Sequence, residues 1–248
     1  MGFASKIKNK GIAVAKRAVQ GYRATSESYI SHLRSIGVEL GNDVVIFSPG
    51  RTNIETFNPH LLTIGSHVAM TGPVTILTHD YSVGVTKIWS HGDVLGSQKP
   101  VIIGNNVFIG WGATILAGTT IGDNCVIGAG SVASGRIEGN SIWGGVPAKR
   151  ICSLEEYYER RKRKQLEEAV EIYSRYKARF HTAPPKELFH EYFYLFTASS
   201  RDLCDVFREK LDDHGNADEC LKWLDSHEPQ FMSFDSFCEY AEGRFPRT

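Results

Sequence analysis

The chain has 248 residues and carries 28 basic and 28 acidic side chains, so its formal net charge is zero. This balance argues against a general polyanion-binding protein, and we expect no nucleic-acid partner. The five cysteines show no C-x-x-C spacing, which indicates reduced thiols in a cytoplasmic protein. No apolar run has the length of a signal-peptide core or a membrane span, so we expect a soluble cytoplasmic protein.

Residues 1–35 are expected to form an N-terminal amphipathic helical cap, with a helix over residues 4–35. Its lysines lie opposite a thin apolar face that includes Ile12, Val19 and Tyr22. Repeat arrays need a cap over their open ends, so we interpret this helix as a cap. A weak contact with a membrane surface through the basic face is the alternative.

The most regular part of the chain repeats every six residues. A large aliphatic residue occupies one phase, and a smaller residue follows four positions later. An amphipathic helix needs a period of 3.6 and an ordinary strand a period of two, so this spacing fits neither. It predicts a parallel β-helix in which each unit supplies one short strand and one turn. The phase positions are Ile103, Ile109, Ile115, Ile121, Ile127 and Ala133, and the smaller residues are Val107, Ala113, Thr119, Cys125 and Ser131.

The same phase recurs earlier, at Ile64, Met70 and Ile76, and more weakly at Leu40 and Ile46. The spacing between Ile76 and Ile103 is not a multiple of six, which predicts an inserted loop over residues 77–100. We therefore expect a mainly β protein whose solenoid covers residues 36–151.

Residues 152–248 predict a C-terminal helical domain. Ser153 and Glu156 have the spacing of a capping box and are expected to open a long helix that runs through Phe180. Pro184-Pro185 is expected to start a second helix, rich in core aromatics, and shorter helices follow near 203–211, 219–224 and 234–241. The basic run from Arg160 to Lys164 is interpreted as a solvated helix face. The sequence assigns this domain no task.

The segment from Lys99 to Val132, followed by G-G-V-P-A-K-R-I from Gly144, resembles the hexapeptide-repeat acyltransferases. This left-handed β-helix superfamily includes sugar, polysaccharide, serine and xenobiotic O-acetyltransferases. The resemblance covers roughly residues 40–151. It implies a homotrimer with active sites between neighbouring solenoids, acetyl-CoA as the acyl donor, and no required metal.

The resemblance also implies that His79, in the segment T-I-L-T-H-D-Y-S, is the catalytic general base. An imidazole that takes the proton of an attacking hydroxyl contributes about 10²–10⁴ in rate. Acetyl transfer is then expected to be direct, without a covalent enzyme intermediate. Asp80 is expected to orient the imidazole or bind the acceptor, with a turn-forming role as the alternative. Asn53 resembles an asparagine near the acceptor in sugar acetyltransferases, although its local spacing departs from theirs.

On the donor side, backbone N–H groups from Gly110 to Gly112 are expected to stabilise the developing oxyanion. Trp111 is expected to pack on the pantetheine arm or adenine of the donor, with a subunit contact as the alternative. Ala129 matches the small residue that the family places beside the donor arm. Lys149 is expected either to meet a coenzyme A phosphate or to be an ordinary exposed lysine.

The expected acceptor is a sugar hydroxyl, in the assembly of a bacterial surface polysaccharide or lipopolysaccharide. Tyr81, Trp89 and His91 of the inserted loop offer stacking faces and polar groups for a saccharide. An amino sugar, an antibiotic and serine are the alternative acceptors. Serine is the less favoured, because serine acetyltransferases carry their helical domain before the solenoid, whereas here it follows.

Two readings from other classes stay open. The first is an inactive trimeric scaffold that recruits partners through its helical tail. The second is a zinc-dependent carbonic anhydrase, because His60, His67, His79 and His91 fall in one stretch. The H-x-x-x-x-H pair typical of those anhydrases is missing, which disfavours a zinc site.

Overall fold

A computed structural model of the chain describes residues 19–211 and 215–244. The chain divides into two compact units, Met1–Glu155 and Glu156–Thr248. This division lies a few residues beyond the domain boundary expected at 151/152, because the last strand and the start of the following helix stay with the first unit. Each unit is described by itself.

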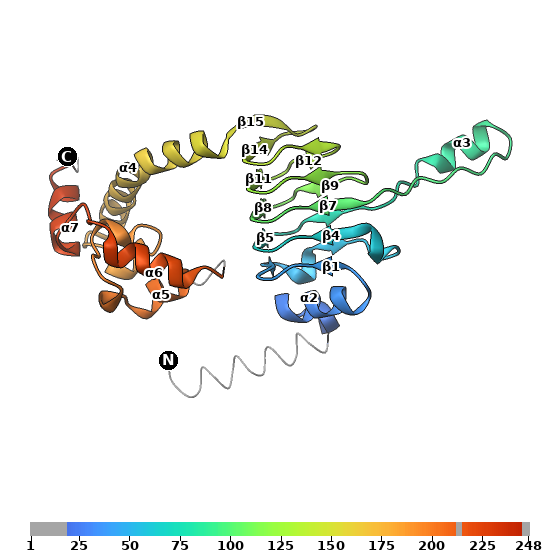
Figure 1. The fold of residues 1–248 in the computed structure, drawn as a ribbon. Helices are drawn as coiled ribbons and strands as arrows, with labels where there is room; N and C mark the ends of the chain where they lie inside the picture. Colours follow the sequence, from blue (N-terminus) through green and yellow to red (C-terminus); the bar gives the residue numbers. More distant parts are fainter. Residues whose placement is uncertain (1–18, 212–214, 245–248) are drawn as a thin grey trace. The chain divides into compact units, whose positions relative to one another are not determined.

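The first unit is a parallel β-helix built from three sheets (Figure 1). Successive strands pass from one sheet to the next, so that each sheet receives every third strand. The last described strand is the exception, because it pairs antiparallel with the strand before it in the same sheet. Sheet A contains β1 (Glu39–Leu40), β4 (Leu62–Ile64), β7 (Val101–Ile103), β10 (Thr120–Ile121) and β13 (Arg136–Ile137); sheet B contains β2 (Val45–Ile46), β5 (Val68–Met70), β8 (Val107–Ile109), β11 (Cys125–Ile127), β14 (Ser141–Gly144) and β15 (Lys149–Ser153); sheet C contains β3 (Asn53–Ile54), β6 (Thr75–Ile76), β9 (Thr114–Ile115) and β12 (Val132–Ala133).

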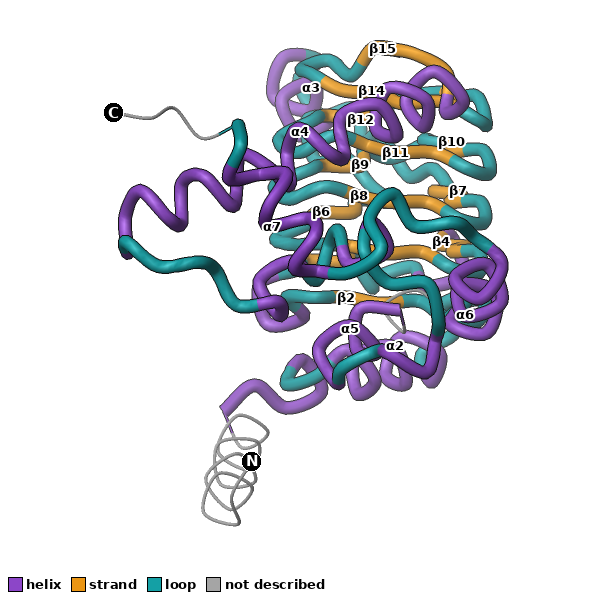
Figure 2. Tube along the Cα trace, turned by 90° about the vertical axis from the view of Figure 1, so that its left-hand side faces the viewer, coloured by secondary structure: helices purple, strands orange, loops and turns teal. Residues whose placement is uncertain are grey.

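The strand register confirms the sixfold repeat. Ile103 pairs with Ile121, Ile109 with Ile127, and Ile115 with Ala133, so one coil takes 18 residues in this region. In Figure 2 the strands cross the solenoid as stacked rungs. All six phase positions and all five smaller positions are at most 1% exposed. This arrangement fits the left-handed β-helix implied by the resemblance.

One corner of the solenoid, between sheets A and B, is held by stacked asparagines. Asn106, Asn124 and Asn140 occupy equivalent turns with φ of 53°, 57° and 54°, a conformation that asparagine tolerates better than most residues. The Asn106 amide donates to the Asn124 side chain at 2.8 Å, and Asn124 donates to Asn140 at 2.9 Å. The ladder therefore satisfies side-chain polar groups along the turn column.

Helix α2 (Ser26–Ser35) packs against the first coil. Its Tyr29, Ile30 and Leu33 are buried in the same core as the coil isoleucines. The Tyr29 hydroxyl accepts the Ile54 N–H at 3.3 Å, and the Ser26 hydroxyl accepts the Ile46 N–H at 2.9 Å. The helix expected over 4–35 is not continuous in the described part: a 3₁₀ turn, η1 (Gly21–Arg23), precedes a capping box at Thr25. Residues 1–18 of that expectation lie outside the described residues.

The inserted loop leaves the solenoid between β6 and β7. The outgoing and returning segments of the loop meet at its base, where His79 and Gln98 form an isolated antiparallel bridge and the Asp80 N–H donates to the Ser97 carbonyl at 2.9 Å. Its outer part forms helix α3 (Val83–Trp89), which the sequence analysis did not predict. Figure 1 shows α3 on an arm that extends away from the coils.

Among its described residues the second unit contains helices and no strand, so the mainly β class holds for the first unit alone. The long helix α4 (Leu154–Phe180) ends where the sequence predicts. Pro184-Pro185 starts not an α-helix but the 3₁₀ turn η4 (Lys186–Phe189), followed by η5 (Phe193–Leu195) and η6 (Ser200–Asp202). The three short helices are α5 (Asp205–Leu211), α6 (Ala217–Ser226) and α7 (Phe234–Glu242). The aromatics do form a core, which includes Phe189, Phe193, Phe196, Phe207 and Phe237.

Within residues 19–211 and 215–244, none of the helices combines the length and the apolar character that crossing a membrane requires.

Candidate active site

The predicted site residues lie on two columns of turns that run up the solenoid. The turns that connect sheet C to sheet A form the C–A corner, which includes residues 55–61 and the inserted loop. The turns that connect sheet B to sheet C form the B–C corner, which includes residues 47–52, 110–113 and 128–131. His79 belongs to the first column and Trp111 to the second.

His79 is held by a buried carboxylate that the sequence analysis missed, Glu55. The two side chains form a close pair through His79 Nδ1 and Glu55 Oε1. The second carboxylate oxygen, Oε2, accepts the Thr78 N–H at 2.7 Å and the His79 N–H at 3.1 Å. Glu55 is 8% exposed, and the His79 side chain is 14% exposed. Residue His79 is therefore fixed both through its backbone N–H and through its ring.

The charge state of Glu55 sets the tautomer of His79. Burial alone would raise the pKa of Glu55, but hydrogen bonds from the Thr78 N–H and the His79 side chain outweigh it, and the pKa lies below its ordinary value of 4.5. An ionised carboxylate can only accept, so Nδ1 of His79 carries the proton that points at Glu55. Nε2 has no hydrogen-bond partner among the described residues. In the neutral ring that nitrogen carries the lone pair.

Sequence spacing concealed Glu55. The first coil departs from the sixfold repeat, because Ile54 follows Ile46 after eight positions, so the outward face of β3 could not be assigned from the repeat. In the structure Ile54 pairs with Ile76, which places Glu55 beside the segment that leads to His79. The available signal for Glu55 in the sequence was that an acidic residue directly follows an aliphatic one, Ile54.

Asp80 does not hold the imidazole in this structure. Its carboxylate accepts the Ser82 N–H at 2.8 Å and the Ser82 hydroxyl at 2.9 Å, and these bonds lower the pKa of Asp80. This is the geometry of the turn-forming alternative. Asn53 is exposed on β3, on the same outward face as Glu55 two residues later. The structure thus brings Asn53 to the histidine's side of sheet C.

Two aromatic rings flank the imidazole. The Tyr81 ring lies edge-on to His79 at 4.1 Å between centroids, and the Phe57 ring lies edge-on at 6.1 Å. Both rings are exposed, Phe57 at 79% and Tyr81 at 74%. Trp89 ends α3 and His91 follows it, both on the outer part of the arm, and within one chain they do not converge with His79.

At the B–C corner, Trp111 is half exposed, and the Arg51 guanidinium lies 4.7 Å from the centre of its ring. Arg51 ends the 3₁₀ turn η2 (Pro49–Arg51) of an earlier coil. The Gly110 N–H donates to the Ile127 carbonyl and the Gly112 N–H to the Pro73 carbonyl, both at 2.8 Å. Of the backbone N–H groups of residues 110–112, that of Trp111 alone has no backbone acceptor among the described residues.

Ala129 and Lys149 also lie on the upper part of this side of the solenoid. Gly130, next to Ala129, donates its N–H to the Trp111 carbonyl at 2.7 Å, so the two turns stack. A Cβ on Gly110 would lie 2.6 Å from the Ala129 nitrogen, so only glycine permits this approach of the coils. Lys149 is exposed on β15, opposite Gly144. The structure therefore groups Trp111, Ala129 and Lys149 on one column, apart from His79.

The histidines of the zinc alternative do not gather. His67 approaches Asp43 with 3.7 Å between Nδ1 and Oδ2, whereas His60 is exposed on the 3₁₀ turn η3 (Pro59–Leu61). Within the described ranges, no three His, Cys, Asp or Glu side chains are grouped as metal ligands require.

Comparison with known proteins places these features in a family. A family profile described as the hexapeptide repeat of succinyl-transferase matches residues 100–133. Protein CapG of Staphylococcus aureus is 42% identical over 125 residues, which are 50% of this chain and 71% of CapG. The galactoside O-acetyltransferase of Escherichia coli K12 is 35% identical over 41% of this chain and 49% of its own length. WbbJ of the same strain, named for lipopolysaccharide-biosynthesis O-acetyl transfer, is 34% identical over 47% of this chain and 65% of its own length.

The repeat, the three-sheet solenoid and these matches define the class of the protein. The chain belongs to the hexapeptide-repeat acyltransferase superfamily, and it is an acyltransferase by that membership. The matches span from about half to 71% of the relatives' lengths, so the names of these relatives do not establish the substrates or partners of this protein.

Proposed function

We propose that this protein is an O-acetyltransferase that moves an acetyl group from acetyl-CoA to a sugar hydroxyl, with His79 as general base. The observation that carries the proposal is the buried pair of Glu55 and His79, which leaves Nε2 of the imidazole without a hydrogen-bond partner in the part of the chain that the structure describes. The names of two relatives, galactoside O-acetyltransferase and the lipopolysaccharide protein WbbJ, support a sugar acceptor. They also favour a role in surface polysaccharide or lipopolysaccharide assembly.

In this mechanism Nε2 of His79 accepts the proton of the attacking hydroxyl as its oxygen forms the new ester bond. The imidazolium that results is stabilised by Glu55, whose charge lies against Nδ1. Acetyl-CoA supplies the activated acyl group and a thiolate leaving group. His79 then returns the proton to the sulfur, which leaves the ring neutral for the next cycle. The backbone N–H of Trp111 is the candidate donor to the thioester carbonyl oxygen, because the backbone N–H groups of Gly110 and Gly112 are already bonded.

The exposed rings of Phe57 and Tyr81 are the proposed acceptor walls. A pyranose presents C–H groups on one face, and the electron-rich face of an aromatic ring attracts them. Both rings lie beside the imidazole, so a sugar packed on them would hold a hydroxyl near Nε2. Asn53, exposed on the same side of sheet C, is the proposed polar contact for a neighbouring hydroxyl.

A homotrimer is part of the proposal. The base lies on the C–A corner and the proposed donor residues on the B–C corner, so one solenoid alone does not bring them together. A second copy whose B–C corner faces His79 would complete the site. The arm supports this assembly, because Val85, Ile88 and Trp89 of α3 are 72–82% exposed in the single chain.

A thiol-release assay tests the proposed function. The full chain is incubated with acetyl-CoA and a panel of sugars, nucleotide sugars and oligosaccharides, with succinyl-CoA as the alternative donor. We expect acetyl-CoA turnover with at least one sugar and a loss of about 10²–10⁴ in kcat for His79→Ala. His190→Ala, in the helical unit, is the matched control and is expected to keep full activity. Equal rates for His79→Ala and the unsubstituted chain would remove the histidine from the mechanism.

A further inference from the structure

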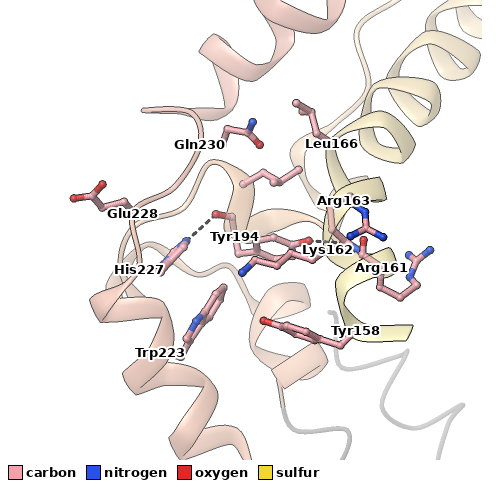
Figure 3. A pocket seen from close by; sticks show the side chains of 12 residues that line it. Tyr158, Arg161, Lys162, Arg163, Leu166, Tyr194, Trp223, His227, Glu228 and Gln230 are labelled. Carbon is pink, nitrogen blue, oxygen red and sulfur yellow. Dashed lines mark hydrogen bonds between the residues drawn. The ribbon is translucent and has the colours of Figure 1, made fainter. Parts of the chain in front are cut away.

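The helical unit contains a pocket that the acyl-transfer chemistry does not use. Its volume is about 680 Å³, within the range of pockets that bind small ligands. It lies between the first half of α4 and the segments around Tyr194 and α6, so all of its lining residues belong to one unit (Figure 3).

One wall is a tryptophan held in a fixed orientation. The rings of Trp223 and His227 stack with 4.6 Å between centroids and 21° between planes, and the Tyr194 ring meets Trp223 edge-on at 5.9 Å. His227 is anchored in turn, because its ring N–H can donate either from Nδ1, 2.7 Å from the Leu224 carbonyl, or from Nε2, 2.8 Å from that of Tyr194. Trp223 nevertheless stays 53% exposed. The stacked His227 ring therefore holds Trp223 so that a large apolar face of the indole stays open to the pocket.

The opposite wall is basic and aromatic. It comes from the run Arg160 to Lys164, of which Arg161, Lys162 and Arg163 line the pocket. Arg161 is neutralised by Glu168 through two bonds of 2.7 Å. Lys162 and Arg163 have no ion-pair partner among the described residues, and Lys162 lies 5.7 Å from the centre of the Tyr158 ring. The basic run is thus only partly a solvated helix face, because it turns two cations toward an aromatic pocket.

Charge and polarity narrow the class of ligand. Lys162 and Arg163 against Glu228 leave one net positive charge on the lining, with Arg161 paired and histidine counted as neutral. One excess charge is balanced by a single carboxylate, whereas a polyphosphate brings two or more negative charges and is repelled more strongly by Glu228. Glu228 and Gln230 offer acceptor oxygens of the kind that sugar hydroxyls bond. An exposed indole face suits the C–H face of a pyranose.

We propose that this pocket binds an acidic saccharide, a sugar segment that carries a carboxylate, with a pyranose on Trp223 and the carboxylate on Lys162 and Arg163. The inference deepens the proposed function, on which it rests for its biological meaning, because it assigns an acidic polymer as the acceptor. The pocket would hold a different part of that polymer from the sugar that carries the reacting hydroxyl.

The proposal is tested by calorimetry of oligosaccharide binding to the full chain, without acetyl-CoA, so that no acyl transfer takes place. The probes are hexasaccharides of hyaluronan, of polygalacturonate and of polysialate, with neutral maltohexaose and ADP as comparisons. We expect at least one acidic hexasaccharide to bind at least about tenfold more tightly than maltohexaose and ADP, and its affinity to fall as salt is raised. Failure of all three acidic probes, or tighter binding of ADP, would overturn the proposal.

Three variants locate the bound probe. Trp223→Ala and the double variant Lys162→Gln with Arg163→Gln are each expected to weaken the acidic probe at least about tenfold. Lys164→Gln removes a charge from the same helix but does not line the pocket, and it is expected to bind like the unsubstituted chain. The double variant keeps the test valid if Trp223→Ala fails to fold, because both cations are exposed. Equal binding by the double variant and Lys164→Gln would contradict the assignment.

A kinetic comparison separates the two proposals. His79→Ala is expected to bind the acidic probe as the unsubstituted chain does, since the pocket lies in the other unit. Trp223→Ala is expected to raise KM for an acidic polymer acceptor, whereas Lys164→Gln is expected to leave that KM unchanged. Probe binding without any acyl transfer would defeat the proposed function alone, and acyl transfer without probe binding would defeat the pocket alone.

Discussion

Replacing Glu55 with glutamine isolates the link between the buried carboxylate and the imidazole. A glutamine oxygen can still accept the N–H groups of Thr78 and His79 that Oε2 accepts now. Its NH₂ group then faces Nδ1 of His79 and can only donate. The ring must therefore accept at Nδ1 and carry its proton on Nε2, the nitrogen that the mechanism needs as a base.

The magnitude follows from that change of tautomer. We expect kcat to fall by about 10²–10³, most of the 10²–10⁴ that a general base contributes, with little change in either KM. Stability is expected to fall by about 2 kcal/mol, because two hydrogen bonds to a charged acceptor become bonds to a neutral one. The loss of activity is thus far greater than any loss of folded protein.

Steady-state kinetics of thiol release and urea unfolding measure the two effects on the same preparation. Glu39→Gln is the matched control, because Glu39 is exposed and accepts the Thr63 hydroxyl at 3.2 Å elsewhere on the solenoid. Unchanged kcat in Glu55→Gln, or a loss equal to that of Glu39→Gln, would refute the tautomer argument.

Three further predictions concern the donor side, acid stability and assembly. Trp111→Ala is expected to raise KM for acetyl-CoA about tenfold and the acceptor KM less; initial-rate kinetics showing the opposite pattern would move Trp111 to the acceptor side. Because the pKa of Glu55 is lower in the folded state, the ionised carboxylate stabilises the fold fully above the ordinary value of 4.5, and this stabilisation is lost as pH falls through the folded-state pKa. Urea midpoints should therefore decline on acidification less steeply in Glu55→Gln than in the unsubstituted chain. A mixture of His79→Ala and Ala129→Trp protomers refolded together should regain about a quarter of the normal activity, because a site between copies needs one intact corner from each neighbour. A mixture as inactive as its parents, or a monomer by light scattering, would count against the trimer.

The repeat made the solenoid predictable in detail. Hexapeptide spacing places each isoleucine on its partner one coil away, so local pattern and tertiary contact carry the same information from Val101 to Ala133. The spacing fails where the chain leaves the repeat. Helix α3 has no apolar stripe facing a core, and the turns after Pro185 bury aromatics without a regular period, so neither had a local signal.

The candidate site shows the same limit. His79 could be found because it stands at the edge of a recognised repeat, where a family resemblance points to it. Glu55 is brought to it by the pairing of Ile54 with Ile76 across 22 positions of sequence, after an irregular coil that hides the register. Asp80 illustrates the opposite case, since proximity in sequence suggested a partner whereas its bonds are local.

The arm is attached where the solenoid can accept additional chain at small structural cost. The coils before and after it pair directly, Ile64 with Ile103 and Ile76 with Ile115, and a short bridge at His79 and Gln98 closes its stem. Lengthening, trimming or exchanging the outer segment would therefore leave the stacked rungs in register. Related proteins could therefore vary the outer segment at this one junction without any change in the pairing of the coils beneath it.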